Sequence, residues 1–115
     1  MSKQRTEKEK WAEILDLIRL QFGKAPDMNA MLFIIGIREL GLIRRAYSKE
    51  EKVRLMDIAV RRLFSRSGYY KLEGQDAEGW PIWDKVKDLP YVDMFQQESL
   101  LRQHIIHYFE EEELI

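Results

Sequence analysis

The segment Met28–Leu40 constrains the fold most, because it is apolar on nearly every side. A helix of this kind has to be buried. Asp27 is placed to cap its start and Gly41 to end it, with the apolar contact of a Schellman ending between Leu42 and Ile37. The sequence therefore predicts a buried central helix over 28–40.

Gly36 lies in the middle of this segment. A glycine there costs about 1 kcal/mol of helix stability relative to alanine. We expect it to let another helix approach closely.

Three capping boxes predict the starts of the other helices, because the two side chains of such a box satisfy free backbone N–H groups. The pairs are Thr6 with Glu9, Ser48 with Glu51, and Asp93 with Gln96. Gly23 and Gly68 are expected to end the first and third helices. The residues expected to face inward are Trp11, Ile14, Leu15, Ile18 and Phe22 in the first helix, Val53, Met56, Val60, Leu63 and Phe64 in the third, and Met94, Leu101, Ile105 and Tyr108 in the last.

The last helix runs into four consecutive carboxylates, residues 110–113. Negative charge at a helix C-terminus opposes the helix dipole. The helix is therefore expected to fray there or to meet a basic group.

From residue 69 to residue 83 the helical spacing of apolar residues gives way to alternation, which indicates a β-hairpin. Tyr70 and Leu72 alternate with charged residues, and a loop is expected from Gly74 to Gly79. Pro81 has no amide hydrogen, so only short edge strands are expected. The predicted fold is mainly α: a compact four-helix domain, 1–115, with a short β-hairpin between the third and fourth helices.

The tracts SKEEK at Ser48–Lys52 and GYYKLEGQDAEGWPIW at Gly68–Trp83 resemble those of a small bacterial protein family without an assigned function. The resemblance covers most of the chain. It implies a compact single domain and supplies no catalytic residue.

Composition excludes several classes of site. The chain has no cysteine, so disulfides, thiolate nucleophiles and cysteine metal sites are excluded. The charged N-terminus is unlike a signal peptide, and the longest apolar run, Ala30–Ile37, is far shorter than the roughly 20 residues of a membrane-spanning helix. We predict a cytoplasmic protein that does not enter a membrane.

No nucleophile or phosphate-binding motif is present. The sequence therefore predicts no catalytic residue and no cofactor, and we expect no enzymatic activity. One alternative is a metal-binding protein: His104, His107 and Glu111 share a helix face, although a further ligand would be needed.

Charge is distributed unevenly. Residues 38–66 carry a net charge of +5 and residues 67–115 a net charge of -7.

Two helices followed by a hairpin also resemble the outline of winged-helix DNA-binding proteins, with Trp80 and Trp83 on the wing. That alternative requires one exposed basic face beside the hairpin, built from Arg44, Arg45, Arg61, Arg62 and Arg66.

The preferred hypothesis is a non-enzymatic binding module that docks a protein partner or a second copy of itself, because aromatic side chains and opposite charges favour association. The residues expected to bind the partner are Trp80, Trp83, Tyr69, Tyr70, Arg61, Arg62 and Arg66. The sequence alone leaves open which aromatic residues are buried.

Overall fold

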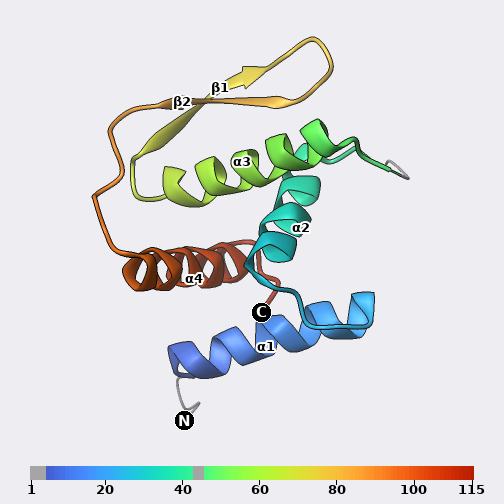
Figure 1. Cartoon of the computed structure of the whole chain (residues 1–115), viewed down its shortest axis with the longest axis vertical. Helices are drawn as coiled ribbons and strands as arrows, with labels where there is room; N and C mark the ends of the chain where they lie inside the picture. The colour runs from blue at the N-terminus through green and yellow to red at the C-terminus, as the bar shows by residue number, and fades with distance from the viewer. Residues whose placement is uncertain (1–4, 43–45) are drawn as a thin grey trace. The chain divides into compact units, whose positions relative to one another are not determined.

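The computed structural model describes residues 5–42 and 46–115. Within them the chain forms four helices and one antiparallel hairpin (Figure 1). The elements are α1 (Glu7–Phe22), α2 (Met28–Leu40), α3 (Lys49–Ser65), β1 (Tyr70–Gln75), β2 (Pro81–Lys85) and α4 (Met94–Glu111). The predicted mainly α fold, with a hairpin between the third and fourth helices, is confirmed.

These elements belong to two units. The α1–α4 unit contains α1 and α4, and the hairpin unit extends from Asp27 to Pro90 and contains α2, α3, β1 and β2. No described helix has both the length and the apolar character that crossing a membrane requires.

The helix starts follow the predicted caps. Thr6 and Glu9 form both bonds of a capping box, as do Ser48 with Glu51 and Asp93 with Gln96. The Asp27 carboxylate accepts a hydrogen bond from the Ala30 N–H at 2.8 Å. Each start is fixed locally, within three residues of its cap.

The helix ends also lie near the predicted positions. Gly41 has a φ of 72°, and its N–H donates to the Ile37 carbonyl at 3.1 Å. This is the single bond of the αL ending, whereas the sequence suggested a Schellman motif. Helix α3 ends at Ser65, shortly before Gly68, and α4 ends at Glu111, inside the carboxylate run.

In the hairpin unit, α2 packs against α3 at Gly36. A Cβ atom added there would lie 2.7 Å from the Leu55 carbonyl carbon and closer still to its oxygen. The prediction that Gly36 permits close helix approach is confirmed. The core beside this contact consists of Leu40, Leu55, Ile58 and Trp80, with Phe33, Ile37, Tyr47 and Trp83 packed against it.

The predicted inward face of α3 is wrong in part. Val53 is 58% exposed. The buried residues of this helix are Leu55, Ile58, Ala59, Leu63 and Phe64. Helix α3 contacts α2 and also both strands of the hairpin, so its buried surface is wider than a single stripe and is turned away from Val53.

The inward faces of α1 and α4 were predicted better near their middles than at their ends. Ile14, Ile18, Ile105 and Tyr108 are buried, as expected. Phe22 and Met94 were also expected to face inward, and both are exposed. Each lies in the first or last turn of its helix. The helical spacing of apolar residues extends into these turns, but no other part of the chain that the structure describes covers the side chain there.

In the hairpin, Tyr70 pairs with Lys85, Lys71 with Asp84 and Leu72 with Trp83. The register then shifts between Leu72 and Gly74, which leaves Glu73 as a bulge residue. Strand β1 therefore continues to Gln75, and the loop is shorter than predicted. Pro81 begins β2 opposite Gln75.

Candidate functional site

The structure assembles several of the predicted partner-binding residues around the Arg61 guanidinium. Its Nε donates to Asp57 Oδ2 at 2.8 Å, and its Nη1 donates to the Trp83 carbonyl oxygen at 2.9 Å. The guanidinium carbon also lies 5.2 Å from the centre of the Tyr70 ring. Arg61 thus connects α3 to both strands.

A second arginine, Arg54, lies seven residues, or about two helical turns, before Arg61 on α3. Its Nη2 donates to Asp76 Oδ2 at 2.7 Å, and its guanidinium lies 4.4 Å from the centre of the Trp80 ring. The other Asp76 oxygen accepts the N–H groups of Glu78 and Trp80, each at 2.9 Å. The hydrogen bond from Arg54 and those from the two backbone amides hold the pKa of Asp76 below its ordinary value.

Between these two arginines lies a small concave site, which we call the hairpin cleft. Its volume is about 180 Å³. It is lined by Arg54, Asp57, Ile58, Arg61, Pro81, Ile82 and Trp83. Because both arginines are already bonded to carboxylates, the cleft offers guanidinium edges and apolar walls and little net charge.

The other predicted partner-binding residues lie elsewhere in the hairpin unit. Trp80 is 1% exposed and belongs to the core, which leaves its side chain no surface for a partner. Tyr69 is half-buried against Phe64, with the Lys87 ammonium 4.6 Å from its ring centre. Arg62 reaches α2, where its Nε lies 3.2 Å from the Glu39 carboxylate.

The nucleic-acid alternative required one shared basic face. Arg61 contacts the hairpin and Arg62 contacts α2, so the side chains of these two neighbours lie on different sides of α3. Arg66 is exposed at the end of α3, and Arg44 and Arg45 lie outside the described residues. Of the five arginines in this alternative, the three that the structure describes are therefore dispersed, and Arg61 and Arg62 are each paired with a carboxylate.

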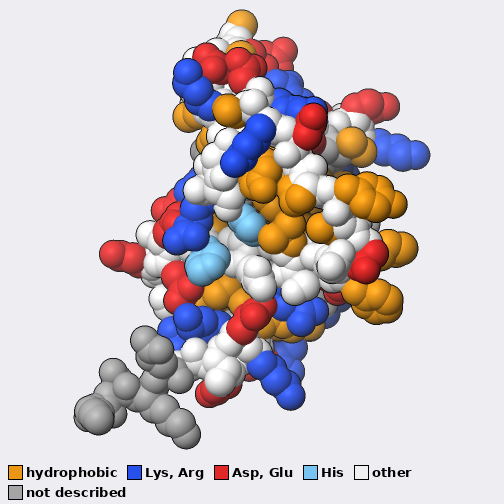
Figure 2. Space-filling view, turned by 90° about the vertical axis from the view of Figure 1, so that its left-hand side faces the viewer, with side chains coloured by type: hydrophobic (Ala, Val, Ile, Leu, Met, Phe, Trp, Pro, Cys, Tyr) orange, Lys and Arg blue, Asp and Glu red, His pale blue; other side chains and the backbone are white. Residues whose placement is uncertain are grey.

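Among the described residues, the most exposed of the large hydrophobic side chains lie where the chain enters α4. Tyr91 is fully exposed, Met94 is 83% exposed and Phe95 is 86% exposed. We call these three residues the α4 start patch. Hydrophobic side chains are visible at the molecular surface in Figure 2. Sequence periodicity placed Met94 inward, and only its position in the first turn of a helix could have warned against this.

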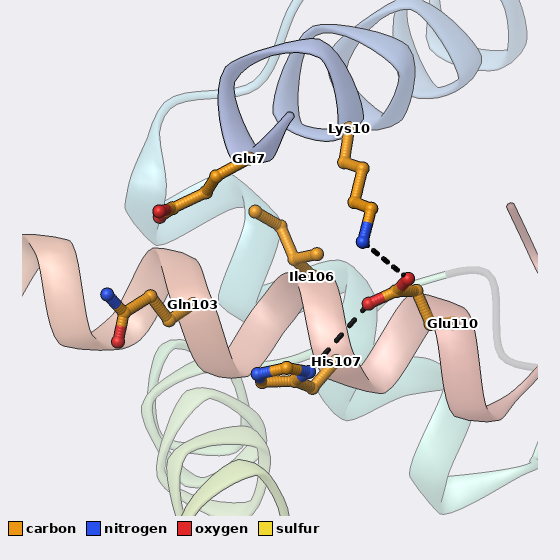
Figure 3. A pocket seen from close by; sticks show the side chains of 6 residues that line it. All are labelled: Glu7, Lys10, Gln103, Ile106, His107 and Glu110. Carbon is orange, nitrogen blue, oxygen red and sulfur yellow. Dashed lines mark ion pairs between the residues drawn. The ribbon is translucent and has the colours of Figure 1, made fainter. Parts of the chain in front are cut away.

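The α1–α4 unit contains a pocket of about 260 Å³ (Figure 3). Lys10 Nζ lies 2.9 Å from Glu110 Oε2, and His107 Nδ1 lies 3.7 Å from Glu110 Oε1. Lys10 is the main cause of a lowered Glu110 pKa. Glu7, Gln103 and Ile106 complete the lining. One of the four terminal carboxylates thus meets a basic group, as expected, but nothing in the sequence identified Lys10.

The two histidines differ in environment. His104 is buried, and its Nδ1 lies 2.8 Å from the Leu100 carbonyl oxygen, whereas His107 is exposed beside Glu110. Over residues 5–42 and 46–115, no three or more His, Cys, Asp or Glu side chains are grouped so that they could hold a metal ion. The geometry therefore offers the metal-binding alternative no ligand set.

Comparison with protein families, with curated proteins and with solved structures finds no match for this chain. The resemblance of the Ser48–Lys52 and Gly68–Trp83 tracts to a small bacterial family stays a prediction.

Proposed function

We propose that the protein is a non-enzymatic interaction module that docks a partner protein through the α4 start patch. The observation that carries this proposal is the near-complete exposure of Tyr91, Met94 and Phe95 within five residues. Single exposed apolar residues are ordinary, but a group of large ones indicates an interaction surface. Aromatic residues and methionine are also the types enriched in the buried centres of protein interfaces.

The partner that fits this patch is a protein surface with an apolar pocket. Full burial of one such side chain contributes about 1.5–3 kcal/mol. The capping box of Asp93 and Gln96 fixes the backbone beside the patch, which lowers the ordering cost of binding. The absence of cysteine supports a cytoplasmic setting for the interaction.

The proposal is tested with two matched double variants. Met94→Ser with Phe95→Ser removes the patch, and Leu17→Ser with Leu20→Ser removes two exposed leucines from α1. The wild type and the α1 variant should both retain a partner protein from an extract of the source organism. The patch variant should not retain that partner. Circular dichroism should show both variants folded, because exposed substitutions change stability little.

Photo-crosslinking then locates the contact. A photoreactive amino acid at position 95 should form an adduct with the same partner, and one at position 20 should not. Equal retention by the two double variants, or an adduct only from position 20, would contradict the proposal.

A further inference from the structure

The outer edge of β1 carries backbone groups that the hairpin itself does not use. The Val86 N–H donates to the Tyr69 carbonyl at 2.9 Å, which sets the alternation of the ladder. Antiparallel pairs alternate between hydrogen-bonded and non-hydrogen-bonded positions. Tyr70 and Leu72 are therefore in non-hydrogen-bonded positions, and their N–H and C=O groups point away from β2.

The corresponding edge of β2 is partly occupied. The Trp83 carbonyl, which points away from β1 by the same alternation, accepts the hydrogen bond from Arg61. Among the described residues, no hydrogen bond reaches the outward backbone groups of Tyr70 and Leu72. The Leu72 side chain is 52% exposed, and the neighbouring Lys71 and Glu73 are exposed as well. The open edge of the hairpin is thus the β1 edge.

We propose that β1 pairs antiparallel with β1 of a second copy, centred on Leu72, to form a four-stranded sheet across a twofold axis. An unpaired strand edge is a ready template for another strand. In a twofold contact the same patch serves both subunits, so its residues have to complement themselves.

The charges of β1 select both the partner and the register. Residues whose backbone N–H and C=O groups point away from β2 have to lie opposite each other in such a dimer. Leu72 can therefore lie opposite Leu72 or opposite Tyr70 of the second copy. The second choice places Lys71 opposite Lys71, and like charges in that position are destabilising. The first choice places Lys71 opposite Glu73 on both sides of the axis. The two side chains already lie on one side of the strand, since Lys71 Nζ is 3.8 Å from Glu73 Oε1.

The Glu73 bulge and the Lys71 charge also limit the contact. A bulge and a lysine on an edge strand discourage pairing with unrelated strands. Only the few residues around Leu72 pair, so the buried area is small and the dimer is weak. The β1 edge shares no residue with the α4 start patch, and the inference does not depend on the proposed function.

Sedimentation velocity from micromolar to millimolar concentration tests the pairing with a charge-swap series. The wild type should form dimers at the upper concentrations, and less so at high salt. Lys71→Glu and Glu73→Lys each create two like-charge contacts across the axis, and each should weaken the dimer about tenfold. The double variant Lys71→Glu with Glu73→Lys restores opposite charges and should recover the wild-type dissociation constant.

Amide hydrogen exchange supplies a readout that does not depend on the variants. Exchange at the Leu72 N–H of the wild type should slow as concentration rises, while exchange at Lys71, whose N–H already faces β2, should not change. A wild type that is monomeric at millimolar concentration overturns the inference. So does a dimer that the single substitutions leave intact, or one that the double variant fails to restore. None of these outcomes bears on the α4 start patch.

Discussion

Arg61 Nη1 donates a hydrogen bond to the Trp83 carbonyl oxygen at 2.9 Å, and this bond connects the C-terminal part of α3 to the outer edge of β2. The same guanidinium holds Asp57 through its Nε. An isolated two-stranded hairpin is at best marginally stable in water. Its attachment to α3 therefore depends on contacts of this kind as well as on the burial of Trp80.

Replacing Arg61 with alanine should lower the free energy of unfolding by about 1–2 kcal/mol, because the partly buried Trp83 carbonyl loses a charged donor. Asp57→Ala is the matched control. It removes only an exposed helix ion pair and should cost no more than about 0.5 kcal/mol. Urea unfolding measures both values, and equal losses would show that the bond to Trp83 contributes little.

Gly36→Ala should destabilise the protein by about 1–3 kcal/mol, although alanine is the better helix former, because the added methyl overlaps the Leu55 backbone. Asn29→Ala, at an exposed position of the same helix, should leave stability unchanged or slightly raised. Denaturant unfolding of the two variants compares these effects. A stable Gly36→Ala protein would mean that α2 and α3 are further apart than described.

Asp76 should make stability sensitive to acid. Its pKa is lowered in the folded state by the hydrogen bond from Arg54 and by the bonds from the Trp80 and Glu78 amides. A lowered folded pKa contributes stability that is fully present above the ordinary carboxyl pKa, about 4, and is lost as pH falls through the folded value.

The melting temperature of the wild type should therefore fall more steeply below pH 4 than that of Asp76→Asn, with a smaller difference between the two proteins in acid than at pH 7. Thermal melts across this range measure the effect. Parallel curves would show that Asp76 is not perturbed.

The ion pair between Lys10 and Glu110 should show a small coupling in a double-mutant cycle. Both side chains are partly exposed, so we expect about 0.2–1 kcal/mol from Lys10→Ala, Glu110→Ala and the double variant. Added salt should reduce the coupling, since exposed charges are screened. A coupling that does not change with salt would argue against an electrostatic origin.

The sequence by itself determined the features that depend on a few neighbouring residues. The caps at Thr6, Asp27, Ser48 and Asp93 were all predicted, because in each the side chain accepts a hydrogen bond from the backbone N–H three residues later. The hairpin was placed correctly between the third and fourth helices, since alternation is also a local pattern. Its bulge, which lengthens β1, was missed, and so was the continuation of β2 beyond residue 83 to Lys85.

Tertiary structure decided which apolar side chains are covered. Trp80 and Phe95 are alike in hydrophobicity, yet the first is buried beneath Arg54 and the second is exposed. Burial requires a second surface, and spacing along the chain does not reveal where that surface lies. For the same reason Val53 was assigned to the core, and the division of Arg61 and Arg62 between the hairpin and α2 became visible only in three dimensions.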